Sequence, residues 1–155
     1  MRLSPHFDSS EFGLPAYSPE NHFLYAVYYN LCNNLLEPIR ARFNLPIKIT
    51  SGYRDPGKNK SVGGAKRSQH MATSQHCAAD FKLNWPLEEV FDWIRSSNLV
   101  WDQCILERPA WDQDPSCIHI SWCRGPQRRQ ALEGLSNGRG RYFYREVKPL
   151  LEEAA

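Results

Sequence analysis

Four side chains of the kinds that bind metal ions lie in two short stretches of the sequence. His70, His76 and Asp80 occur within eleven residues, and His119 lies inside the apolar segment Cys-Ile-His-Ile-Ser-Trp. Glu107 ends the apolar stretch before that segment. Histidines, an aspartate and a separate carboxylate are what a catalytic zinc site requires, because three protein ligands leave the fourth position for water.

A zinc ion held in this way lowers the pKa of its bound water to about 7 and polarises a carbonyl group. A nearby carboxylate then takes the proton of the water and passes it to a leaving amine, as in peptide hydrolysis. Each residue also has an ordinary explanation. His119 suits a half-buried strand, Asp80 could bond a turn backbone, and Glu107 could face solvent. The spacing by itself therefore indicates a metal site without establishing one.

Hydrophobic patterns predict the elements that would position these residues. Apolar residues recur at helical spacing after the helix-start signal Ser18-Pro19-Glu20, and we expect this helix to end near Phe43, kinked or divided at Pro38. Shorter helices are predicted over 86–94 and 126–132. The predicted strands are 47–50, 78–83, 103–107, 117–122 and 141–147.

The mixture of helices and strands has no regular βαβ order. We therefore predict the α+β class, with a small, mainly antiparallel sheet and flanking helices. We expect a single domain over residues 1–155, with an irregular N-terminal segment at 1–16 and a frayed tail at 150–155.

The composition excludes several classes of protein. With 155 residues, 41% of them hydrophobic and 23% charged, the chain is neither disordered nor a coiled coil nor collagen-like. No stretch approaches the ~20 apolar residues that span a bilayer. A net charge of +2 is too small to indicate a nucleic-acid binder, and the basic C-terminal third is better explained as a solvated face. The five cysteines form no Cys-x-x-Cys pair, so we expect reduced, mostly buried thiols.

Several short motifs follow one another in a fixed order between Phe7 and Leu132. They are Ser51-Gly52-Tyr53-Arg54, Asn59, Val62-Gly63-Gly64, Ser68-Gln69-His70, Ala78-Ala79-Asp80-Phe81, Asp102-Gln103, Ile105-Leu106-Glu107 and Ile118-His119-Ile120-Ser121. Together they resemble the zinc D-alanyl-D-alanine carboxypeptidase family, which shares its fold with the hedgehog signalling domain. The resemblance is greatest to the type found in phage and prophage cell-wall peptidases.

The resemblance implies roles for individual residues. It assigns His70, Asp80 and His119 as the zinc ligands and Glu107 as the catalytic carboxylate. It also implies that Arg54 binds a peptide carboxylate or carbonyl, a task that suits the paired donors of a guanidinium group. Ser68 is expected to add a hydrogen bond in the same wall of the site.

The sequence departs from the family pattern between the first two ligands. The spacing from His70 to Asp80 is longer than usual, and Ser-Gln-His occurs twice, so His76 is an alternative first ligand. We favour His70 because the run from Val62 to His70 matches the family without a gap.

Two further departures lie near the third ligand. The loop between Glu107 and His119 is longer than usual and carries Asp112 and Asp114, which are less favoured as rival bases. Cys117 replaces the usual tryptophan. Strand alternation puts it on the same face as His119, where a fourth ligand would close the site to water.

The resemblance implies a Zn²⁺-dependent peptidase that hydrolyses the peptide moiety of bacterial peptidoglycan, encoded by a phage or prophage as an endolysin or virion-associated protein. The alternative is a non-catalytic, metal-binding structural or virion module of the same fold. The expected partner is the peptidoglycan stem peptide, with phage virion or lysis proteins as further candidates. We expect neither a specific nucleic acid nor a membrane as partner. The N-terminus has no apolar signal segment, so we expect cytoplasmic synthesis and action on the cell wall, or carriage in a virion.

Overall fold

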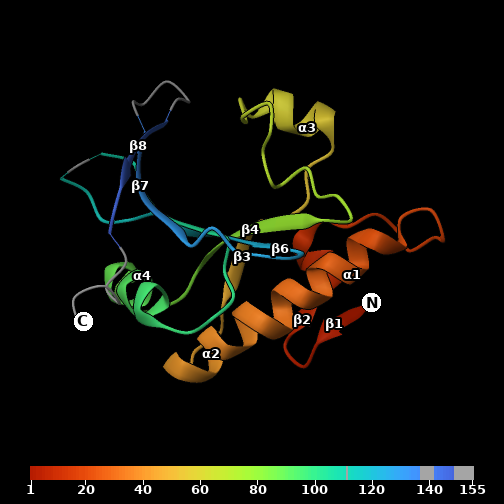
Figure 1. Cartoon of the computed structure of the whole chain (residues 1–155), viewed down its shortest axis with the longest axis horizontal. Helices are drawn as coiled ribbons and strands as arrows, with labels where there is room; N and C mark the ends of the chain where they lie inside the picture. The colour runs from red at the N-terminus through yellow and green to blue at the C-terminus, as the bar shows by residue number, and fades with distance from the viewer. Residues whose placement is uncertain (111, 137–141, 149–155) are drawn as a thin grey trace.

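A six-stranded sheet runs through the centre of the molecule (Figure 1). The computed structural model describes residues 1–110, 112–136 and 142–148. Across the sheet the strands are β3 (Lys48–Ser51), β4 (His76–Lys82), β6 (Cys117–Cys123), β5 (Gln103–Arg108), β7 (Gln130–Ser136) and β8 (Tyr142–Glu146). All neighbouring pairs are antiparallel except β5 and β7, which confirms the predicted α+β class with a mainly antiparallel sheet.

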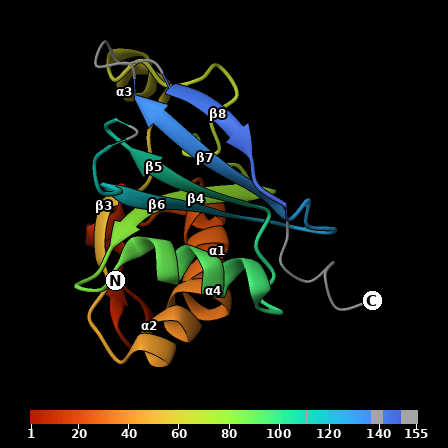
Figure 2. The same ribbon diagram turned by 90° about the vertical axis from the view of Figure 1, so that its left-hand side faces the viewer.

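The longer helices cover one face of this sheet. Figure 2 shows α1 (His22–Leu31), α2 (Glu37–Phe43) and α4 (Leu87–Ser96) together on one side, whereas the short α3 (Pro56–Ser61) lies on the other side. None of the helices described is both long enough and apolar enough to cross a membrane.

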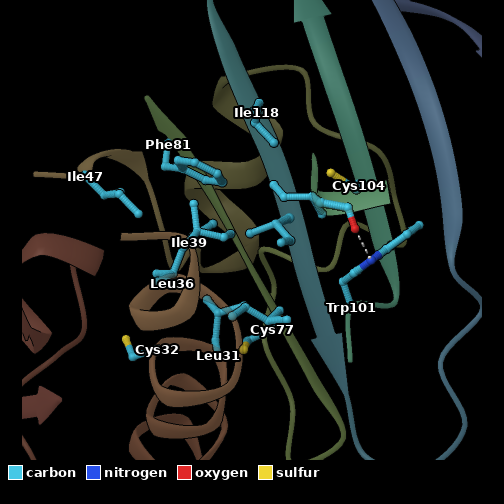
Figure 3. Packing of buried hydrophobic residues seen from close by; sticks show 14 of the residues in the cluster. Leu31, Cys32, Leu36, Ile39, Ile47, Cys77, Phe81, Trp101, Cys104 and Ile118 are labelled. Carbon is cyan, nitrogen blue, oxygen red and sulfur yellow. Dashed lines mark hydrogen bonds between the residues drawn. The ribbon is translucent and has the colours of Figure 1, made fainter. Parts of the chain in front are cut away.

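The hydrophobic core fills the space between the sheet and the long helices (Figure 3). Leu31 and Ile39 from the helical layer are fully buried, as are Phe81 and Ile118 from the strands. Successive side chains of a strand point to opposite faces of the sheet. Because Phe81 and Ile118 point toward the helices, their neighbours Asp80 and His119 point to the opposite face. The burial of the core thus fixes the face that carries the candidate ligands.

The predicted long helix is present, but it begins later and is interrupted. It starts at His22 rather than near Ser18, with Asn21 in the N-cap position. A π-helical segment, Cys32–Leu36, separates α1 from α2. Pro38 lies in the first turn of α2, directly after the π-helical segment, and has no N–H group to donate to the preceding turn. The division therefore falls just before the proline.

Two expectations about local structure are wrong, and one helix was not predicted. Segment 1–16 is not irregular throughout, because it contains β1 (Arg2–Ser4), β2 (Phe7–Asp8) and a 3₁₀-helix (Ser9–Phe12). The helix predicted over 126–132 is absent, since residues from Gln130 onward form β7 against the edge of β5. The helix α3 was not predicted. The tail 150–155 lies outside the described residues.

Candidate active site

The three proposed ligands come from a loop and two strands and meet at one point. His70 lies in the loop between α3 and β4, Asp80 lies on β4, and His119 lies directly opposite Asp80 on β6. His70 Nε2 lies 3.1 Å from Asp80 Oδ1 and 3.2 Å from His119 Nδ1, and His119 Nδ1 lies 2.9 Å from Asp80 Oδ1. All three residues are buried.

The N-terminal segment and a glycine hold the His70 ring in place. The carbonyl oxygen of Gly52 lies 2.7 Å from His70 Nδ1 and can only accept, so Nδ1 carries the hydrogen. A Cβ atom on Gly52 would lie 2.5 Å from the Cα atom of Phe12, so only glycine allows this close approach. Tyr53 N donates to the carbonyl of Phe12 at 2.8 Å and fixes the same contact.

The loop that carries His70 is shaped by a buried asparagine. Asn59 in α3 donates from Nδ2 to the carbonyl of Ala65 at 2.9 Å and accepts a backbone hydrogen bond from Gly64. A Cβ atom on Gly64 would lie 2.1 Å from Asn59 Oδ1. The sequence Asn-x4-Gly-Ala therefore folds the chain back tightly before it reaches His70.

The donor set fits a zinc ion in both type and spacing. Because His70 Nδ1 carries the hydrogen of the neutral ring, its Nε2 presents a lone pair toward Asp80 Oδ1 and His119 Nδ1. A cation between these three atoms would satisfy all of them. Two donors bound at 2.0–2.1 Å to one tetrahedral ion lie about 3.3 Å apart, close to the separations observed. Among the residues described, this is the one group of three metal-binding side chains that converges in this way.

Asp80 is held ionised, as a metal ligand must be. Burial opposes its charge, but contacts with the rings of His119 and His70 bring its pKa well below the usual range. Its second oxygen, Oδ2, accepts a hydrogen bond from Arg54 Nη2 at 3.1 Å. Arg54 is itself fixed by Ser51 Oγ, at 3.0 Å from Nε and 2.8 Å from Nη2. The arginine therefore lies beside the metal site with its charge partly balanced.

Glu107 lies on the same face of the sheet, two residues beyond Ile105, which pairs with His119. Its side chain lines the same cleft as the three ligands. Burial and then the negative charge of Asp80 raise the pKa of Glu107. A carboxylate with a raised pKa is a better proton acceptor, which suits a general base.

Cys117 pairs with Glu107 across β5 and β6, and its thiol donates to Glu107 Oε2 at 3.4 Å. Burial, and then the charge of Glu107, raise the pKa of Cys117 well above its usual range. Of the side chains whose positions are described, only His70, Asp80 and His119 make up the metal-binding group. Cys117 therefore contacts Glu107 and is not a fourth member of the metal-binding group.

The alternative candidates lie elsewhere. His76 begins β4 opposite Cys123 and is outside the converging group. Its Nδ1 atom is buried with no hydrogen-bond partner in the described part of the chain. Asp112 and Asp114 are exposed on the loop after β5 and are not among the cleft residues that the structure describes.

The ligands and Glu107 open into a cleft of about 710 Å³. One wall is the ligand loop from Val62 to His70, which includes Ser68, and Ser68 Oγ accepts a hydrogen bond from the backbone of His70 at 3.3 Å. Tyr142 and Tyr144 of β8 form part of the opposite wall. Their rings are nearly parallel, at an angle of 20°, with centroids 6.2 Å apart.

Sequence reasoning missed a second group of residues beside the ligand loop. The buried carboxylate of Asp102 accepts hydrogen bonds from Gln69 at 2.9 Å and from the side chain of Arg128, the shortest at 2.6 Å. Asp102 and Gln69 both stand in the motifs that carry the family resemblance. Their contact, however, joins residues 33 positions apart, which no local pattern reveals.

A comparison with curated proteins finds no match. A comparison with family models finds one described as Peptidase M15, over residues 5–104. The matched region is 100 of the 155 residues and contains Arg54, His70 and Asp80. It ends before Glu107 and His119, which the fold brings into the same cleft. The match over most of the length shows that the chain belongs to the peptidase M15 family.

Proposed function

We propose that the protein is a zinc-dependent peptidase that hydrolyses the peptide moiety of bacterial peptidoglycan. The observation that carries this proposal is the convergence of His70, Asp80 and His119 on one point, beside Glu107 in an open cleft. Membership of a peptidase family supports peptide hydrolysis. The peptidoglycan substrate rests on the resemblance to phage and prophage cell-wall peptidases.

In this proposal, different residues of the cleft have different roles in the reaction. His70, Asp80 and His119 would hold zinc, which when bound supplies a Lewis acid that polarises the scissile carbonyl. Glu107 accepts a proton from the attacking water as the carbon–oxygen bond forms. It then donates that proton to the amine nitrogen as the carbon–nitrogen bond breaks.

Arg54 and Ser68 orient the peptide in this scheme. The guanidinium group of Arg54 is fixed by Ser51 and Asp80, so it loses little conformational freedom when a carbonyl or carboxylate of the substrate binds. Ser68 lines the cleft on the same side as His70 and offers a hydroxyl group to the peptide backbone.

We also propose that the protein is encoded by a phage or prophage and acts on the cell wall as an endolysin or as part of a virion. This part of the proposal rests on the family resemblance. Its partners would then be the stem peptide and the lysis or virion proteins of the phage.

Mass spectrometry of digested sacculi tests the proposed function. The protein is incubated with purified sacculi of several wall chemotypes, with a chelator, and again after zinc is restored. We expect new peptide fragments that disappear with the chelator and return with zinc, and their masses identify the bond. The variant Glu107→Gln should keep its zinc and release no fragments.

Two results would reject this scheme. Full activity of Glu107→Gln would reject the assignment of the base. A folded, zinc-loaded protein that releases no fragment from any chemotype would favour the non-catalytic metal-binding module instead.

A further inference from the structure

The strands that form the floor of the cleft place different residues on the two sides of the metal site. The row Asp80–His119–Ile105–Leu132 crosses the sheet at the metal site. Toward one end, Glu107 is followed across the sheet by Gly134 and Tyr144. Toward the other end, β5 begins at Gln103, which also lines the cleft. The aromatic wall and the start of β5 therefore lie on opposite sides of the metal site.

Asp102, which directly precedes β5, holds the side chain of Arg128 in a fixed position. Arg128 has an exposed side chain (54%), whereas its partner Asp102 is almost completely buried (3%). Asp102 accepts from Arg128 Nε at 3.0 Å and from Nη2 at 2.6 Å, and it also accepts from the backbone N of Arg128 at 2.9 Å. These bonds fix the guanidinium group on the surface of the cleft.

The clamp by Asp102 leaves one nitrogen of the guanidinium group without an acceptor among the described residues. Asp102 and Gln69 contact Nε and Nη2, and Nη1 of Arg128 makes no hydrogen bond within the described residues. Nη1 carries two hydrogens, and a hydrogen bond from a charged guanidinium group to a carboxylate is stronger than one between neutral groups. Within the described part of the chain, Nη1 of Arg128 therefore remains available to a ligand, whereas Nη2 already has two acceptors.

A second arginine adds unbalanced charge to the same cleft. Arg67 lies three residues before His70 on the ligand loop, is exposed, and lines the cleft. It forms no hydrogen bond or ion pair with any residue that the structure describes. Because Arg128 is balanced by Asp102, Arg67 supplies the net positive charge that attracts an anion.

We propose that Arg128 and Arg67 form a carboxylate-binding subsite that selects acidic peptides. This proposal rests on the proposed peptidase function and names the substrate class that the cleft prefers. Asp102, which holds Arg128, precedes Ile105 by three residues, so its backbone lies roughly 10 Å along the chain from the row of residues at the metal site. That is about three residues of an extended peptide.

Two groups of a stem peptide carry this chemistry, the α-carboxylate of a γ-linked glutamyl residue and the C-terminal carboxylate. Four synthetic pentapeptides, L-alanyl-γ-D-glutamyl-L-lysyl-D-alanyl-D-alanine with each carboxylate either free or amidated, separate the two sources. Binding is measured by calorimetry on the zinc-loaded Glu107→Gln protein, which should not turn the peptides over. We expect amidation of one carboxylate to weaken binding about tenfold or more, as expected for loss of a charge-assisted hydrogen bond.

Substitutions link that preference to the two arginines. In the Glu107→Gln background, Arg67→Gln and Arg128→Gln should each reduce the difference between acid and amide to less than about threefold. Arg124→Gln removes the same charge from an exposed position outside the described cleft lining and should leave the difference unchanged. Arg67 has no partner among the residues that the structure describes, so its variant tests the subsite even if Arg128→Gln unfolds.

The proposal is overturned if acid and amide forms bind equally, if none of the peptides binds, or if the preference survives Arg67→Gln. These outcomes are distinct from failure of the proposed function. A binding preference in a protein that releases no fragments from sacculi would retain the subsite and reject the peptidase.

Discussion

At the scale of single residues, Asp80 links the metal site to the substrate cleft. One oxygen faces the two histidines, and the other accepts from Arg54. A ligand with such an outer partner has a fixed orientation, and loss of such partners typically costs 10–100-fold in metal affinity. The hydrogen bond from Arg54 therefore helps to orient Asp80 toward the two histidines.

The two Ser-Gln-His copies provide the sharpest test at this scale. His70→Ala should abolish tight zinc binding, because it removes one of three converging donors. His76→Ala should bind zinc as the unsubstituted protein does, since His76 lies outside the group. Zinc affinity is measured by competition with a coloured chelator. Loss of zinc from His76→Ala, with retention in His70→Ala, would reverse the assignment.

At the scale of elements, β8 presents two unlike faces. Tyr142 and Tyr144 point toward the cleft, and Phe143 between them points away, as strand alternation requires. Tyr144 lies opposite Gly134 on β7, where a Cβ atom would come within 3.1 Å of its ring. The glycine thus allows the ring to lie against the strand beside Glu107. Burial, and then the negative charge of Glu107, raise the pKa of Tyr144 to about 12.

We expect Tyr144→Ala to raise KM several-fold with a smaller change in kcat, because the ring forms part of the substrate wall and not of the reacting group. Phe143→Ala is the matched control, since Phe143 is 66% exposed on the opposite face of the same strand. Kinetics are measured on a fluorogenic peptide that the protein cleaves. Equal changes in the two variants would indicate an effect on the strand as a whole.

At the scale of the whole molecule, Asp102 connects parts of the chain that are distant in sequence. Its carboxylate joins Gln69 of the ligand loop to Arg128 before β7, while its backbone bonds Ser121 of β6. Burial opposes the charge, but hydrogen bonds from Arg128 outweigh this and lower the pKa of Asp102 to about 2. Since its ordinary value is 3.8, the folded state binds this proton less readily than the unfolded chain.

The sign of the pH dependence follows from that difference. The stability due to the Asp102 charge is fully present above pH 4 and is lost as the pH falls through about 2. We expect Asp102→Asn to lower the free energy of unfolding at pH 7 by about 2 kcal/mol. The gap between the two proteins should persist to pH 4 and shrink toward pH 2. Urea unfolding at these pH values measures it, and a gap independent of pH would show that the charge is not responsible.

The amino-acid sequence is enough to identify the residue types of the candidate site. Strand alternation places Asp80, His119 and Glu107 on one face because their neighbours are apolar and must be buried. The fold class follows from the same patterns. The fold-class prediction succeeds because the hydrophobic periods of strands and helices are local properties of the chain.

Tertiary structure decided the rest. The two Ser-Gln-His copies share the same three residues, and the fold separates them because the carbonyl of Gly52 orients the ring of His70 toward Asp80 and His119. Residues after 126 suit a helix, but the open edge of β5 offers hydrogen-bond partners that make them β7. The contacts of Arg128 and of the β8 tyrosines join distant segments. Such contacts depend on which backbone groups and surfaces remain unpaired after folding, and a single segment of sequence does not contain that information.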